Sequence, residues 1–158
     1  MRISAKADYA IRALAHITAQ GGHLPVKAEH IAQAQGIPLT FLLGILRELK
    51  NAHFLRSQRG ADGGFYLNRP ASTITLAEVI RVVDGPLANV RDASLRQMTY
   101  VGPAARLADV WMAVRAALRS VLDVVTIADL ASGSLPESVE AMAAGYAAQV
   151  SREPLARG

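Results

Sequence analysis

The sequence contains no cysteine, and only 5% of its residues are aromatic. The missing cysteine excludes disulfide bonds, thiolate zinc sites, thiol nucleophiles and iron–sulfur clusters held by thiolates. No apolar run approaches the roughly 18–20 residues of a membrane span. The start of the chain also lacks the apolar segment and cleavage site of a signal peptide. We therefore expect a soluble, cytoplasmic protein with no membrane partner.

The rest of the composition is that of a globular chain, with 158 residues, of which 51% are hydrophobic and 19% charged. This length allows one domain, or one small domain with an appended element. The charge is uneven, because residues 1–70 hold nine Lys/Arg against four Asp/Glu, whereas residues 71–158 hold eight Arg against nine acids. A basic first half indicates an anionic partner such as nucleic acid. A chance distribution is the alternative.

Three helices are predicted in the first half. Ser4 can cap a helix that runs to about residue 20 and ends at two glycines. A short second helix over about 27–35 ends at Gly36, which suits a left-handed turn. A proline then opens a third helix, over about 38–51. A short helix, a glycine turn and a proline-started helix form the pattern of a helix-turn-helix.

The third helix has two distinct faces. Its apolar stripe, spaced for burial, consists of Leu42, Ile45, Leu46 and Leu49. The opposite face carries hydroxyl, amide and basic groups, and consists of Thr40, Leu43, Gly44, Arg47, Lys50 and Asn51. Such a face suits the major groove of DNA. An ordinary solvent-exposed face is the alternative for this helix taken alone.

A basic hairpin is predicted after the third helix. Two short strands, over 54–58 and 65–68, flank the loop 59–64, which contains three glycines. The loop lacks the Gly-Lys-Ser/Thr of a phosphate-binding P-loop and the dinucleotide fingerprint. A helix-turn-helix followed by a hairpin is a winged helix, and this wing places Arg56 and Arg59 beside the duplex, where one can enter the minor groove. A hairpin with no partner is the alternative.

The second half is predicted to be helical. Thr75 and Glu78 form a capping box for a helix that ends at about residue 84. We expect an irregular loop over 85–102, then dimerisation and C-terminal helices over 103–150, and a frayed tail over 151–158.

The longest helix is expected over about 103–125. Apolar residues recur along it every three or four positions: Leu107, Trp111, Val114, Leu118, Val121 and Val125. A repeat of about 3.5 residues is typical of paired helices. A second copy of the chain is the simplest partner, and packing on the chain's own domain is the alternative.

These pieces together resemble a family of winged-helix bacterial regulators that includes IscR, NsrR and CymR, the Rrf-two type. The matching motifs are Met1-Arg2-Ile3-Ser4, Asp8-Tyr9-Ala10, Ile31-Ala32, Gly36-Ile37, the helix from Leu42 to Leu49, Arg59-Gly60, Gly63-Gly64-Phe65 and Ile74 to Ile80. The resemblance covers roughly residues 1–130. It implies a mainly α fold with a small β-hairpin wing, a long dimerisation helix and a dimeric transcription factor, usually a repressor.

The resemblance also implies roles for individual residues. Positions on or near the DNA-reading helix are Pro38, Thr40, Phe41, Leu43, Gly44 and Arg47, and Arg59 lies on the wing. Ser4, Lys6 and Tyr9 match the start of the first helix, which often touches the phosphate backbone.

The chain departs from the family at two places. Some members carry polar residues where this chain has Leu43 and Gly44, and we therefore expect a different operator. Cluster-binding members also place three cysteines in the loop after the fourth helix, where this chain has neither cysteine nor histidine. Asp8 occupies a position that supplies a cluster ligand in some members, but alone it cannot hold a cluster and is read as a helix-start charge.

The four histidines, His16, His23, His30 and His53, lack metal-ligand spacing. We therefore expect no metal site and no cofactor.

The sequence thus predicts a sequence-specific DNA-binding regulator, a homodimeric repressor without an iron–sulfur cluster. Its signal would be a small molecule bound near 85–105, a partner protein, or its own abundance. The alternative is a winged-helix protein-interaction module that does not bind DNA. An enzyme is not expected, because no nucleophile–base pair or paired carboxylates occur at a recognisable spacing.

Overall fold

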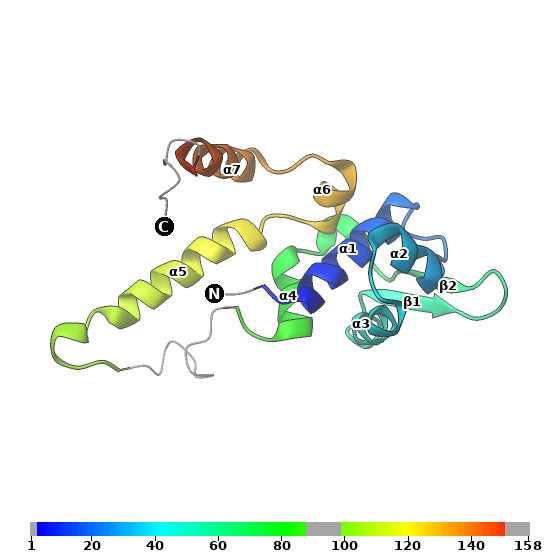
Figure 1. The fold of residues 1–158 in the computed structure, drawn as a ribbon, viewed down its shortest axis with the longest axis horizontal. Helices are drawn as coiled ribbons and strands as arrows, with labels where there is room; N and C mark the ends of the chain where they lie inside the picture. The colour runs from blue at the N-terminus through cyan, green and yellow to red at the C-terminus, as the bar shows by residue number, and fades with distance from the viewer. Residues whose placement is uncertain (1–2, 88–98, 151–158) are drawn as a thin grey trace, which may run out of the picture.

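The computed structural model describes residues 3–87 and 99–150. Most of the expected loop over 85–102 and the whole tail over 151–158 lie outside the described residues. Figure 1 shows a helical protein with one two-stranded hairpin, as the sequence predicted. Its elements are α1 (Ala5–Ala19), α2 (Ala28–Gln35), α3 (Leu39–Asn51), β1 (Leu55–Gln58), β2 (Gly64–Leu67), η1 (Ala71–Thr73), α4 (Leu76–Asp84), η3 (Gly102–Ala104), α5 (Leu107–Leu122), α6 (Ile127–Ser132) and α7 (Glu137–Val150).

The predicted signals set the ends of the first three helices. Ser4 caps α1 by accepting a hydrogen bond from the Ala7 backbone N–H at 2.9 Å. Gly36 ends α2 with a φ of 62°, a left-handed conformation that favours glycine. α3 begins one residue later than expected. Pro38 therefore precedes the helix as its N-cap instead of occupying its first turn.

The hairpin is antiparallel, with Leu55 opposite Leu67 and Gln58 opposite Gly64. A backbone bridge between Val26 and Phe65 joins it to the segment before α2. A Cβ at Gly64 would lie 2.4 Å from the Val26 carbonyl oxygen, so only glycine allows this approach. The wing is therefore fixed at its base to the helix-turn-helix.

The hydrophobic core lies where α1, α3 and α4 meet, and it extends to α6. Its fully buried large side chains are Leu14, Ile17, Ile31, Leu42, Ile45, Leu46, Leu49, Leu55, Ile74, Val79 and Ile127. The set includes the whole apolar stripe predicted for the third helix. This burial turns the opposite face of α3 outward.

The segment after α5 returns to this core. The Ile127 N–H donates to the Ile74 carbonyl at 2.9 Å, and the Leu76 N–H donates to the Val125 carbonyl at 3.0 Å. Val125 is only 2% exposed within the single chain. This burial removes Val125 from the expected dimer seam, because its side chain is already covered by its own domain.

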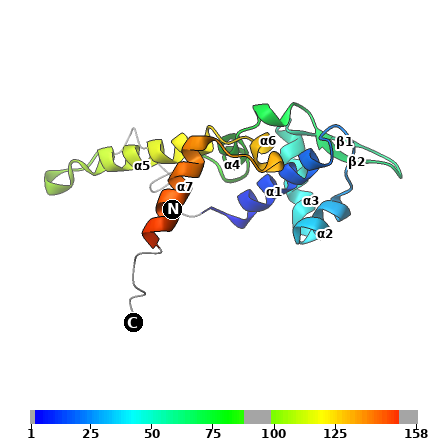
Figure 2. The same ribbon diagram turned by 90° about the horizontal axis from the view of Figure 1, so that it is seen from above.

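Helix α5 is shorter than the sequence predicted. It begins at Leu107, after the short turn η3 around Pro103, and it ends at Leu122. Asp123 is its C-cap, and the Asp123 carboxylate pairs with Arg119 at 2.6 Å and with Arg81 of α4 at 2.8 Å. In Figures 1 and 2 the helix extends away from the winged-helix part, on the side opposite the hairpin.

Among the described residues, no helix combines the length and apolarity needed to cross a membrane.

Candidate nucleic-acid interface

The outward face of α3 presents every residue that the sequence assigned to DNA reading. Its exposed side chains and the glycine among them are Thr40, Phe41, Leu43, Gly44, Arg47 and Lys50, preceded by exposed Pro38. Phe41 is 45% exposed and Leu43 41% exposed. A Cβ built on Gly44 meets nothing within 4 Å. The face is therefore basic at its C-terminal end and partly apolar at its N-terminal end.

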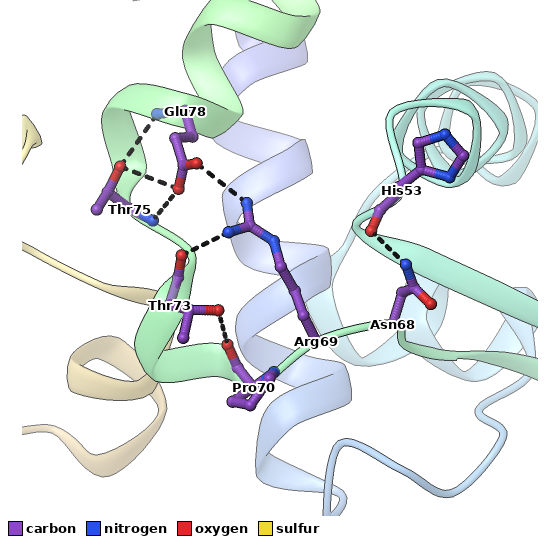
Figure 3. Close-up of polar contacts among 7 residues, drawn as sticks. All are labelled: His53, Asn68, Arg69, Pro70, Thr73, Thr75 and Glu78. Carbon is purple, nitrogen blue, oxygen red and sulfur yellow. Dashed lines mark hydrogen bonds and ion pairs between the residues drawn. The ribbon is translucent and has the colours of Figure 1, made fainter.

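The wing carries exposed Arg56 and Arg59. Asn68 fixes its base, since its amide accepts a hydrogen bond from Arg56 Nε at 2.5 Å. The same amide donates a hydrogen bond to the His53 carbonyl at 2.9 Å (Figure 3). His53 closes α3 with a φ of 62°, unusual for a residue other than glycine. One side chain thus connects the end of α3 to both strands of the wing.

A second polar cluster joins the wing to α4. Arg69 donates to the Thr73 carbonyl at 2.7 Å and to Glu78 Oε1 at 3.1 Å (Figure 3). Glu78 also accepts from the Thr75 backbone N–H at 3.0 Å, which completes the predicted capping box. Partial burial raises the pKa of Glu78, but the hydrogen bond from Thr75 and the Arg69 guanidinium more than offset it. The pKa of Glu78 is therefore below its ordinary value.

The three residues expected to touch phosphates from the first helix are half-buried, and each has an intrachain contact. Ser4 Oγ donates to Asp84 Oδ1 at 2.7 Å, and Lys6 Nζ pairs with Glu48 at 2.7 Å. The Tyr9 ring meets the Phe41 ring edge-on, with centroids 5.8 Å apart. Tyr9 therefore lies beside the outward face of α3.

Among the described residues, five cationic side chains have neither an acidic partner nor a hydrogen bond, and four of them lie on the helix-turn-helix and wing. These are Lys27, Arg47, Lys50 and Arg59, with Arg115 on α5 as the fifth. Unpaired surface cations keep their full field for an anionic partner. The helix-turn-helix and wing thus concentrate the positive charge that the sequence predicted for the first half.

Lys27 was not singled out from the sequence. It stands at the N-cap of α2, where a cation opposes the helix dipole and makes no capping hydrogen bond. The sequence signal that could have identified Lys27 is its position at the predicted start of the second helix.

An open hollow of about 680 Å³ separates the end of α3 from the hairpin. Its lining includes Lys50, Asn51, His53, Arg56, Ser57 and Tyr66. Lys50 and Arg56 make the hollow basic, so it suits a strand of phosphates running between the helix and the wing.

A helix-turn-helix followed by a hairpin is the fold of the winged-helix proteins, and in this chain both parts carry unpaired cations. Comparison with known proteins identifies the family within this class. The Rrf2 family model, described as iron-dependent transcriptional regulator, matches residues 3–133. An HTH-type transcriptional regulator of Mycobacterium tuberculosis is 48% identical over 151 residues, which cover 96% of this chain and 94% of that protein.

CymR of Bacillus subtilis is 33% identical over 132 residues, covering 84% of this chain and 91% of CymR. Its solved structure, described as the global cysteine regulator, superimposes with a TM-score of 0.71 at 32% identity over 85% of this chain and 98% of that one. The structure of T. potens IscR superimposes with a TM-score of 0.67 at 28% identity, over 84% and 88% of the two chains.

The chain therefore belongs to the Rrf2 family of bacterial transcriptional regulators, and family membership implies DNA binding. The family description names iron, but the residues present do not fit a thiolate-held cluster, because the sequence has no cysteine. In residues 3–87 and 99–150, no three His, Asp or Glu side chains gather as a metal site.

Proposed function

We propose that this protein is a homodimeric, sequence-specific DNA-binding repressor that works without an iron–sulfur cluster. The observation that carries the proposal is the group of unpaired cations on α3 and the wing, beside an exposed face that nothing in the described chain covers. Charges left unpaired on one side of a winged helix are what binding to a polyanion requires.

In this arrangement α3 lies in the major groove. Thr40, Leu43 and Gly44 face base edges, and Arg47 reaches a guanine or a phosphate. Arg59 enters the minor groove, while Lys50 and Arg56 hold phosphates on either side of the basic hollow. Pro38 and Phe41 shape the helix entry, and the start of α1 with Ser4, Lys6 and Tyr9 lies along the backbone.

The proposed dimer is formed through α5. Leu107, Trp111, Val114, Leu118 and Val121 recur along one stripe and are only half-buried in the single chain. Trp111 Nε1 donates to the Tyr100 hydroxyl at 3.2 Å, which holds the indole in place on this stripe. Two copies paired through α5 would present two reading helices to half-sites about one helical turn apart.

Control of such a repressor requires a signal other than a cysteine-held cluster. A small molecule bound near 85–105, a partner protein or the abundance of the repressor itself would supply it, in the cytoplasm. Bound over a promoter, the dimer would block transcription until that signal lowered its affinity for DNA.

The test is footprinting across the intergenic region beside the protein's own gene, followed by binding titrations at increasing salt. We expect a protected palindromic site and an affinity that falls steeply with salt. In vitro transcription from that promoter then reports the direction of control, and repression is expected. Absent or salt-insensitive binding would overturn the proposal.

A protein-interaction module without DNA binding is the second candidate. It is favoured by exposed apolar side chains outside the winged helix, on α5 and α7: Val110, Met112, Met142 and Tyr146. Capture of a stoichiometric protein partner, together with no affinity for any duplex, would support this function instead.

A further inference from the structure

Two helices of the described chain, α5 and α7, contain no buried residue, whereas α1, α2, α3, α4 and α6 each contain at least one. Figures 1 and 2 show both helices extending from α6 on the side away from the hairpin. α5 is already assigned to the proposed homodimer. α7 has 14 residues and no assigned partner.

The apolar residues of α7 are arranged for pairing. Val139, Ala143, Tyr146 and Val150 recur at steps of four, three and four, and Met142 lies beside them. Met142 is 47% exposed, Tyr146 70% and Val150 49%. An isolated helix of this length is marginal in water, so this stripe needs a covering surface.

The charges of α7 and α5 are complementary. α7 carries Glu137 and Glu140 in its first turn and no basic residue, and neither acid has a partner among the described residues. Of the arginines at α5, Arg106 and Arg119 are paired with neighbouring aspartates. Arg115 has no partner in the described chain.

The unpaired charges also occupy matching positions. Arg115 directly follows Val114 of the α5 stripe, and Glu140 directly follows Val139 of the α7 stripe. In paired helices, residues that flank the apolar stripe form the interhelical ion pairs that select the partner. A contact between these two helices would therefore pair both charges.

α7 also lies beyond the part of the chain common to the family. The family model ends at residue 133, whereas the match to the mycobacterial relative covers 96% of this chain and so extends through α7. The helix is thus an addition to the shared winged-helix and α5 arrangement.

We propose that α7 packs against α5 of a second copy of this chain, with Glu140 facing Arg115 of the partner subunit. The inference rests on the proposed homodimer and extends its interface from α5 to α7. Each dimer would contain the contact twice, once from each chain.

The test uses charge reversal in the full-length chain. Arg115→Glu and Glu140→Arg are each expected to weaken self-association by about fivefold to tenfold at low salt, because two attractive pairs become two like-charge pairs. Mixing the two single variants in equal amounts should restore wild-type association, since both contacts of the mixed dimer are again attractive. Sedimentation over a dilution series measures this.

Matched controls are Arg59→Glu on the wing and Glu29→Arg on α2, which reverse exposed charges that have no partner in the described part of the chain and lie outside the proposed contact. They should leave self-association unchanged. Circular dichroism should show native helix content for every variant, because Arg115 is only half-buried and the other three charged side chains are exposed. Tyr146→Ala gives an independent reading of the apolar stripe, and we expect it to weaken association by about tenfold.

The outcomes separate the inference from the proposed function. Single variants that associate like the wild type would overturn the inference alone. If the mixture is no better than its components, while a chain with both substitutions recovers, α7 contacts α5 of its own chain and the inference is overturned. A wild-type chain that stays monomeric at every concentration overturns the proposed homodimer and the inference together.

Discussion

The Arg69 guanidinium lies 3.1 Å from Glu78 Oε1 and so connects the wing to α4 (Figure 3). Arg69 follows the second wing strand and also stacks over the Phe54 ring, with 4.9 Å between the guanidinium carbon and the ring centroid. Glu78 belongs to the capping box that begins α4. One arginine therefore fixes the wing to the helix that leads toward the loop expected over 85–102.

Arg69→Met should lower the free energy of unfolding by about 1–2 kcal/mol at neutral pH, since it removes a half-exposed ion pair and a cation–π contact. The pKa of Glu78 is lowered in the folded chain, so its contribution is present above the unfolded pKa and is lost as pH falls through the folded pKa. The stability gap between wild type and Glu78→Gln should therefore shrink between about pH 5 and pH 3. Urea unfolding at several pH values measures both effects, and a pH-independent gap would contradict the assignment.

Arg59→Ala should weaken operator binding by about tenfold and lower its salt dependence, because the cation proposed to enter the minor groove is removed. The reason is that Arg59 has no partner among the described residues, so none of the described contacts has to break before it binds. Arg106→Ala is the control, because that side chain is 90% exposed at the start of α5 and, within residues 3–87 and 99–150, pairs with Asp109 alone. Fluorescence anisotropy at several salt concentrations distinguishes them, and equal losses for the two variants would argue against a wing contact.

Gly44→Ala should stabilise the fold and weaken DNA binding at the same time. A glycine inside a helix costs about 0.5–1 kcal/mol relative to alanine, and the added Cβ meets nothing within 4 Å in the single chain. The helix thus has a destabilising glycine at the position where α3 is proposed to approach the duplex most closely. Thermal unfolding and operator titration of the same sample provide the two readings. Higher stability with unchanged affinity would mean that α3 does not approach DNA at this point.

Asn68→Ala should lower operator affinity without changing its salt dependence. The substitution removes no charge, but it frees Arg56 and releases the wing from the His53 carbonyl. We expect a loss of about threefold to tenfold in affinity and about 1 kcal/mol in stability. Gln33→Ala, an exposed position on α2 whose side chain has no hydrogen bond among the described residues, is the matched control. A change in salt slope would point to a lost phosphate contact instead.

Local signals predicted the winged helix well. The capping residues Ser4 and Thr75 and the left-handed Gly36 depend on neighbours within one turn, so the sequence alone specifies them. The stripe of α3 follows from helical periodicity, and it defines the exposed face by exclusion. The wing strands differ from the expected ranges by about one residue, which is the usual fraying of element ends.

Contacts between distant segments were not predictable in the same way. Val125 continues the spacing of the α5 stripe, but the helix stops at Asp123, whose partner Arg81 lies on α4. Periodicity cannot reveal an ion pair across that separation, and so Val125 was placed in the wrong environment. The links made by Asn68 and Arg69 were missed for the same reason, since neither residue stands in a local pattern.

The return of Ile127 to the core has a consequence for dissecting this protein. The winged helix is not a module that can be cut from the chain after α4, because Ile127 fills a space between α1 and η1 and its backbone completes a bridge at Thr75. In a fragment that ends near residue 87, the space that the Ile127 side chain fills would be open to solvent. The core of the winged helix is closed only by residues that follow α5, so a nascent chain can complete this core only after α5 and α6 have been synthesised.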